Sequence, residues 1–178
     1  TMGSNTAGLY ADDAGGTVQM FGISESGSVS QLTGLDIRKT GDETVTDTTI
    51  QNDDHLTVNL LASSAYDCQF TIFFTNAGAA EGIKMDVNGT VGVSSLKAQI
   101  SIYDDTLNSL AAFARVTALA SSVGAGISSG DNYADIHVTI ETTTAGTFLL
   151  RFAQNAAGAS AGVTVQENSS LGCHKANA

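Results

Sequence analysis

Every even position is aromatic, aliphatic or cysteine in the stretch Tyr66-Asp67-Cys68-Gln69-Phe70-Thr71-Ile72-Phe73-Phe74. A β-strand points successive side chains to opposite faces, so this alternation indicates a strand with one buried face and one wet face. The same two-residue period returns at 56–60, 96–102, 136–140 and 148–152. Many half-buried strands joined by polar connections are typical of a sandwich. We therefore predict an all-β fold: an antiparallel, jelly-roll-like β-sandwich.

The domain organisation follows from length and from where the long alternating runs begin. A chain of 178 residues suits one sandwich domain and an arm. Residues 8–32 read as short strands with Gly- and Asp-containing turns, and they carry too little apolar surface to fold alone. Residues 1–7 are small and polar, and we expect them to be extended. We predict an N-terminal arm at 1–35 and the β-sandwich domain at 36–178.

Two local patterns bear on the secondary structure between the long alternating runs. Residues 107–123 fit both helical spacing and alternation, and the surrounding pattern favours a strand. The pair Asn88-Gly89 lies between Val87 and Val91, and Asn-Gly favours a type I′ hairpin because both central residues need positive φ. We therefore expect a two-residue hairpin at this pair.

The charge excludes several classes of partner. The formal net charge is -11, so phosphate backbones and anionic lipid surfaces are repelled, and we expect neither a nucleic-acid nor a membrane partner. No apolar run reaches the length of a membrane-spanning helix, and no basic-then-apolar leader opens the residues given, so we expect neither feature.

An acidic cluster precedes the first long alternating run. Its members are Asp36, Asp42, Glu43, Asp47, Asp53 and Asp54. Such a cluster is usually a solvated loop, and the alternative is a divalent-cation site, which His55 could join.

The two cysteines, Cys68 and Cys173, are far apart in the chain, and each lies on the buried phase of an apolar run. Two interpretations stay open: two buried free thiols, or a disulfide that joins an early strand to the last one. They form no C-x-x-C pair, which excludes a zinc ribbon or a thioredoxin motif.

No catalytic constellation can be assembled from the sequence. The histidines are scattered, and His137 lies on the polar phase of its run. Asp104 and Asp105 are adjacent at a strand end, so their side chains face opposite ways and make a poor acid/base pair. We predict that the protein is not an enzyme, and we predict no cofactor and no catalytic residues.

Three groups of motifs together point to a known family. The C-terminal third carries Thr144-Ala145-Gly146-Thr147-Phe148-Leu149-Leu150-Arg151-Phe152-Ala153-Gln154-Asn155, followed by Val163-Thr164-Val165 and Ser169-Ser170-Leu171. This segment resembles the closing strands of small β-rich structural proteins of tailed bacteriophages. Upstream, 52–60 followed by Tyr66 is similar to the opening strands of that family, and 8–32 is similar to a short β-repeat of phage fibre proteins. Phe152 stands where the family usually has Trp.

This resemblance implies a non-enzymatic virion protein, made in the host cytoplasm, which decorates the capsid or forms part of a tail appendage. It implies a homotrimer with other virion proteins, such as the major capsid protein or tail proteins, as further partners. The arm would add strands to a neighbouring subunit. The alternative from the residues is a carbohydrate-binding, receptor-recognising sandwich, for which Tyr10, Tyr103 and Tyr133 are the candidate ligand or interface residues.

Overall fold

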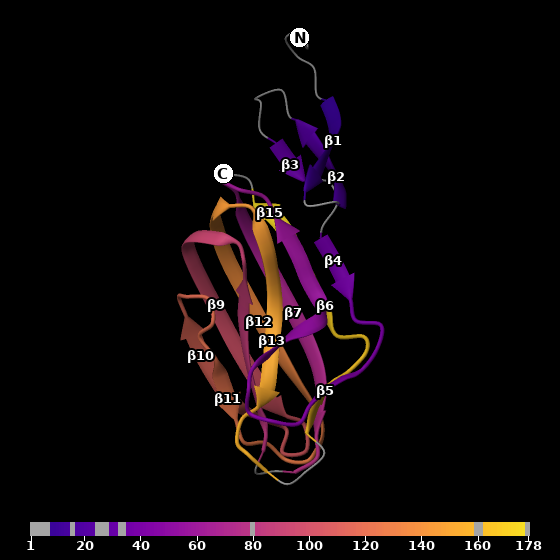
Figure 1. Cartoon of the computed structure of the whole chain (residues 1–178), viewed down its shortest axis with the longest axis vertical. Coiled ribbons are helices and arrows are strands. Elements are labelled where there is room, and N and C mark those ends of the chain that lie inside the picture. Colours follow the sequence, from indigo (N-terminus) through magenta and orange to yellow (C-terminus); the bar gives the residue numbers. More distant parts are fainter. Residues whose placement is uncertain are drawn as a thin grey trace.

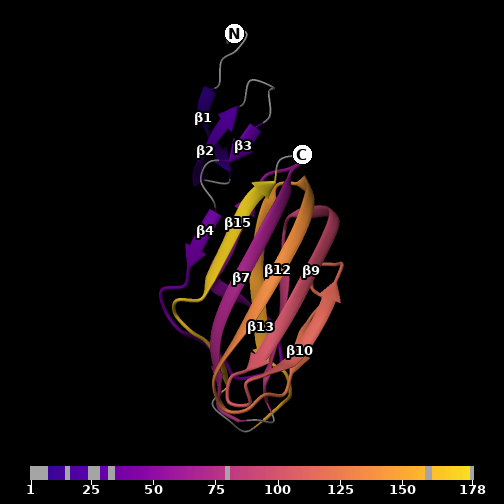
Figure 2. The ribbon, with the colours of Figure 1, turned by 180° about the vertical axis from the view of Figure 1, so that it is seen from behind.

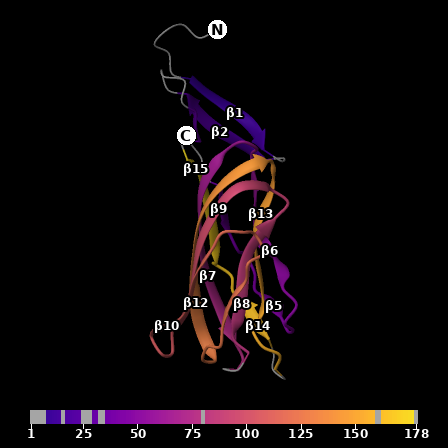
Figure 3. The same ribbon diagram turned by 90° about the vertical axis from the view of Figure 1, so that its left-hand side faces the viewer.

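The computed structural model describes residues 8–14, 17–23, 29–31, 35–78, 81–158 and 162–176. Within these ranges every regular element is a β-strand, and two antiparallel sheets pack face to face (Figures 1 and 3). The predicted all-β antiparallel sandwich is confirmed. The described ranges hold no helix with the length and apolarity needed to span a membrane.

The larger sheet is built around its longest strands, which run in the order β10-β9-β12-β7 (Figure 2). Beyond β7 the sheet divides, because β15 pairs with one part of β7 and β14 with the other, while β4 pairs with β15 and β5 with β14. The bounds are Leu35–Arg38 (β4), Glu43–Val45 (β5), Ala65–Asn76 (β7), Gly92–Asp104 (β9), Ser109–Val116 (β10), Gly130–Thr144 (β12), Val163–Val165 (β14) and Ser170–Ala176 (β15).

The smaller sheet has the order β11-β8-β13-β6, with β6 at Gln51–Leu60, β8 at Ile83–Gly89, β11 at Val123–Ala125 and β13 at Gly146–Gln154. The core lies between the two sheets. It is filled by even-numbered side chains of β6, β7, β9, β12 and β13, which set the sequence pattern, and by odd-numbered side chains of β8, β14 and β15. Phe70 of β7 and Phe148 of β13 meet edge to face, with ring centroids 5.8 Å apart. Both rings are fully buried, so this contact joins the layers near the centre of the core.

The strands β1 (Gly8–Ala14), β2 (Thr17–Ile23) and β3 (Val29–Gln31) form a separate three-stranded antiparallel sheet. Figure 1 shows this sheet beyond the end of the sandwich at which β15 terminates. The first strand that belongs to the sandwich is β4, which pairs with the last strand, β15. Residues 1–7, which we expected to be extended, lie outside the described residues.

The two local patterns had different outcomes. Ser109–Val116 forms β10, which confirms the choice of strand over helix there. The hairpin expected at Asn88-Gly89 is wrong: β8 stays paired with β13 through Gly89, opposite Phe148, and the chain then crosses to the larger sheet. Gly89 has φ of 152°, and a Cβ there would collide with the Thr147 carbonyl. The glycine therefore permits a close backbone approach instead of a tight turn.

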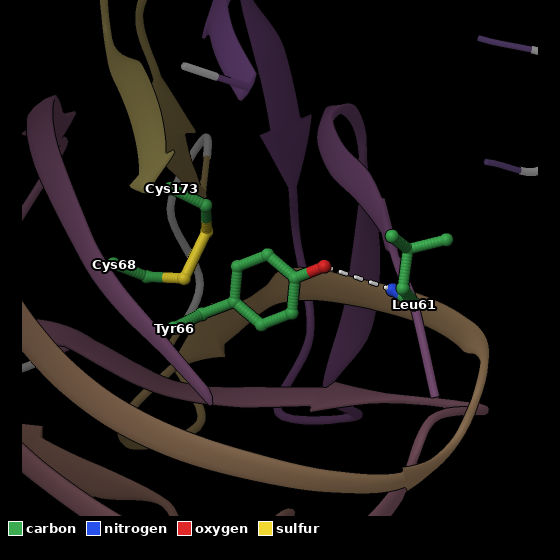
Figure 4. Close-up of a disulfide and its surroundings, with 4 residues drawn as sticks. All are labelled: Leu61, Tyr66, Cys68 and Cys173. Carbon is green, nitrogen blue, oxygen red and sulfur yellow. Dashed lines mark hydrogen bonds between the residues drawn. A yellow bond between two sulfur atoms is a disulfide. The ribbon is translucent and has the colours of Figure 1, made fainter. Parts of the chain in front are cut away.

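Cys68 and Cys173 are bonded, so the disulfide alternative is the correct one. The two residues are direct partners in the β7–β15 register, with Cα atoms 4.1 Å apart (Figure 4). The neighbouring Tyr66 is fully buried, and its hydroxyl accepts a hydrogen bond from the Leu61 N–H at 3.1 Å. Burial raises the pKa of Tyr66 and outweighs the opposing effect of that hydrogen bond. The turn between β6 and β7 is thereby tied to the disulfide-bonded strand.

Candidate interaction surface and buried charged cluster

A row of large side chains crosses the outer face of the larger sheet. Tyr133 of β12 is in register with Tyr103 of β9 on one side and Phe73 of β7 on the other, and Leu110 of β10 continues the row beside Tyr103. We call these four residues the aromatic row. Phe73 is 42% exposed and Leu110 is 51% exposed. The row is therefore an apolar stripe on a face whose other side chains are mostly polar.

The two tyrosines of the row stack on each other. The ring centroids of Tyr103 and Tyr133 are 4.5 Å apart and the planes differ by 10°. Each ring gives one face to the other, and the register places Leu110 beside Tyr103 and Phe73 beside Tyr133. Burial, Tyr103 and two nearby aspartates raise the pKa of Tyr133, so its phenol stays a neutral hydrogen-bonding group at physiological pH.

An acidic hollow adjoins the Phe73 end of the row. Its acidic lining residues are Asp42, Asp105, Asp131 and Glu167. Phe73 and Tyr133 line the same hollow, so the apolar stripe lies directly beside the acidic residues. A partner of this surface would meet apolar rings and, next to them, a cluster of carboxylates.

The loops below the hollow are fixed by buried polar groups. Asn132 donates to the side-chain oxygen of Asn76 at 2.9 Å, and Asn76 donates to the Ile127 carbonyl at 3.0 Å. The buried Asp104 carboxylate accepts the Ser128 N–H at 2.7 Å. This bond, followed by further N–H donors, holds the pKa of Asp104 below its usual value despite burial. The surface around the hollow is thus pre-organised.

The structure brings together two of the three predicted tyrosines. Tyr103 and Tyr133 form the centre of the row, whereas Tyr10 lies on β1 opposite Phe21 of β2, in the separate small sheet. Phe73 and Leu110 also belong to this surface, and neither was predicted from the sequence. The signal was available: Phe73 breaks the alternation by placing an aromatic ring on an odd position.

A second cluster is buried at the start of the sandwich. Lys39, directly after β4, donates from Nζ to Glu43 Oε2 at 2.9 Å and to Asp53 Oδ2 at 2.9 Å. The side chains of Lys39 and Asp53 are fully buried, and that of Glu43 is 17% exposed. Burial lowers the pKa of Lys39, but the hydrogen bonds and charges of Asp53 and Glu43 outweigh it, and the net shift is upward.

The cluster bears on both interpretations of the acidic region. Ligand atoms of Glu43, Asp53 and His55 lie within 4.8 Å of one another, as a cation site would require. The Lys39 ammonium lies among them, also 3.3 Å from His55 Nδ1, and supplies the positive charge. The remaining members, Asp36, Asp42, Asp47 and Asp54, are exposed. Asp42 and Asp47 lie in connections between strands, as expected of a solvated loop, whereas Asp36 lies on β4 and Asp54 on β6. Lys39 was not singled out in the sequence, where its signal is only a lysine four residues before Glu43.

Backbone donors hold the other oxygen of the buried aspartate. Asp53 Oδ1 accepts the N–H groups of His55 at 2.9 Å and Leu56 at 2.8 Å. The backbone of Lys39 is fixed as well, because its N–H donates to the Ser169 carbonyl at 2.8 Å. The amine and the carboxylate are therefore held in contact from both sides.

Comparisons with protein-family models and with curated proteins find no match for this chain. Among solved structures, those of infectious bursal disease virus, strains Gx and Gt, show likeness at 8% and 11% identity, with TM-scores of 0.23 and 0.22. The alignments cover 90% and 92% of this chain and only 50% and 53% of the virus chains, so it spans about half their length. Likeness at this level carries no argument about function.

Proposed function

We propose that this chain is a non-enzymatic structural protein of a tailed-bacteriophage virion. It would decorate or stabilise the capsid, or form part of a tail appendage, through contacts between β-sandwich subunits. The observation that carries the proposal is the aromatic row on the outer face of the larger sheet. The phage-like strand motifs at 52–60 and 144–171 support the assignment to this class.

The row has the chemistry of a protein–protein contact. Aromatic side chains are enriched at interfaces, where each can bury about 150–250 Å². The stacked tyrosines are already ordered, so covering them costs little side-chain entropy. We propose that a second copy of the chain covers the row in a homotrimer, and that the capsid or tail protein contacts another face. The N-terminal arm would add its strands to a neighbour.

The stacking favours this function over carbohydrate binding. A sugar ring packs on the free flat face of an aromatic side chain, and the Tyr103 and Tyr133 faces that meet are already occupied. The acidic hollow beside Phe73 could still hydrogen-bond sugar hydroxyls, so receptor recognition is the second candidate.

The test is the solution mass by light scattering of the wild type and of the variant Phe73→Ser/Tyr133→Ser. We expect a trimer for the wild type and a monomer for the variant. Thr139→Ser, on the same face of β12 as Tyr133, is the matched control and should stay trimeric. A wild-type monomer at all concentrations would overturn the subunit contact, and glycan-array binding that is lost in the same variant would establish the second candidate.

A further inference from the structure

The Lys39 cluster contains the parts needed to form a covalent bond. A primary amine contacts a carboxylate at 2.9 Å, both groups are fully buried, and a second carboxylate contacts the same amine at 2.9 Å. Reacting groups that are held in contact behave as if present at effective molarities of about 10⁵–10⁸ M. Water, the reactant that would drive hydrolysis, has little access to the reacting pair, because the side chains of Lys39 and Asp53 have no exposed surface.

We propose that the chain forms an intramolecular amide bond between Lys39 Nζ and Asp53 Cγ, with Glu43 as the proton-transfer group. This inference goes beyond the proposed virion function and does not depend on it. It assigns a self-modification site to residues that otherwise would form only a buried ion pair.

The atoms balance as a dehydration. One proton crosses the hydrogen bond from Nζ to Asp53 Oδ2, which leaves a neutral amine beside a neutral carboxylic acid. The nitrogen lone pair attacks Cγ and forms the C–N bond, Glu43 takes a second proton from the nitrogen and passes it to Oδ2, and the C–Oδ2 bond breaks with release of water. One ammonium and one carboxylate become one amide and one water, Glu43 is regenerated, and no oxidant or reductant is required.

The hydrogen bonds around Asp53 suit this step. Attack at Cγ places negative charge on Oδ1, and Oδ1 already accepts the N–H groups of His55 and Leu56 at 2.9 and 2.8 Å. Two backbone donors aimed at a developing oxyanion are the arrangement that stabilises acyl-transfer intermediates. Oδ2, the oxygen that leaves, is the one that contacts Nζ.

The charge balance of the cluster provides a driving force and sets the rate. An isolated buried charge is costly, and amide formation removes one positive and one negative charge from the interior. The raised pKa of Lys39 makes the neutral amine the minor form, so the reaction should be slow after folding. The reacting pair holds the same protons as the ion pair, so the rate should not rise with pH and should fall once the shared proton is lost.

The bond would fasten the two sheets together. Lys39 follows β4, which pairs with β15 in the larger sheet, whereas Asp53 belongs to β6 of the smaller sheet. Because β4 is also the strand through which residues 1–34 connect to the sandwich, the amide would anchor that segment covalently. A pull on the N-terminal sheet would then be resisted by a covalent bond.

The test is the mass of the purified full chain, measured unfolded and reduced. We expect a value lower than the sequence mass by one water. Trypsin should cut after Arg38 but not after the modified Lys39, so the fragment 39–84 should appear lighter by one water. The sequence mass together with cleavage after Lys39 and a 40–84 fragment of normal mass would overturn the proposal.

Variants separate the roles of the groups. Lys39→Arg keeps the positive charge but has no primary amine, so it should show the full mass. Glu43→Gln should slow bond formation at least tenfold, as followed by mass after refolding. Asp54→Asn, an exposed neighbour of Asp53, is the matched control and should form the bond at the wild-type rate. A wild-type rate in Glu43→Gln would overturn the role of Glu43.

Discussion

Removal of the Cys68–Cys173 disulfide should strongly destabilise the sandwich. The bond closes a loop with a sequence separation of 105 residues. In the chain-entropy description, a cross-link over a loop of this length stabilises the folded state by about 5 kcal/mol, because it restricts the unfolded chain. Small and medium domains have unfolding free energies of about 5–15 kcal/mol, so the disulfide supplies a large part of the total.

The assay is urea unfolding of Cys68→Ala, Cys173→Ala and the double variant, compared with the wild type. Either single substitution removes the whole cross-link, so each should lose about 5 kcal/mol plus about 1 kcal/mol for the buried sulfur. The double variant should lose only about 1 kcal/mol more than either single variant, which is strong non-additivity. The slope of free energy against urea should also rise, because the unfolded chain becomes less compact.

Val138→Ala is the matched control, since Val138 is buried and pairs with Cys68 in the β7–β12 register. It removes core volume without removing a cross-link, and its loss should be clearly smaller and its slope unchanged. Single cysteine variants that unfold at the wild-type urea midpoint, or losses that add in the double variant, would refute the loop-closure reasoning.

Three further predictions concern single contacts, each measured by urea unfolding. Arg151 contacts the buried Asp86 through two hydrogen bonds of 2.8 Å. Arg151→Met leaves that buried carboxylate unpaired, so it should lower the free energy of unfolding by about 3–5 kcal/mol. Adding Asp86→Leu should restore much of the stability. Asp104→Asn should destabilise the protein at neutral pH. Because the pKa of Asp104 is lowered by folding, the ionised carboxylate stabilises the folded state fully above its ordinary pKa of 3.8. This stabilisation is lost as the pH falls through the folded-state pKa. The difference in unfolding free energy between wild type and variant should therefore vanish in strong acid. Gly82→Ala should cost more than about 1 kcal/mol, because Gly82 has φ of 55° and a Cβ would collide with β11, whereas Gly41→Ala, with open space around Gly41, should be nearly neutral.

Local sequence pattern predicted the strands but not the contacts between them. The alternation at 66–74 was sufficient because burial on one face dictates every second residue of β7. The pairing of Tyr103 with Tyr133 depends on the register between β9 and β12, which neither strand encodes alone. The Asn88-Gly89 hairpin was wrong because the same dipeptide also suits a close crossing between strands.

The counter-charge of the buried cluster was likewise not predictable from the local sequence. The sequence indicated an acidic region and offered solvation or a cation as its balance. The actual counter-charge is Lys39, which reaches Asp53 across 14 residues and across the gap between the sheets. A short-range pattern contains no information about such a contact, so only the folded topology reveals it.

The pairing of the first sandwich strand with the last has a consequence for biosynthesis. One edge of β7 next to Cys68 remains open until β15 arrives, and β4 has no sheet partner before then. Because β15 is the last of the described strands, the sheet cannot close until residues 170–176 have left the ribosome exit tunnel. Folding of the sandwich should therefore finish only after β15 has emerged, and until then the exposed edge of β7 is a site for chaperone binding or for mispairing with another nascent chain.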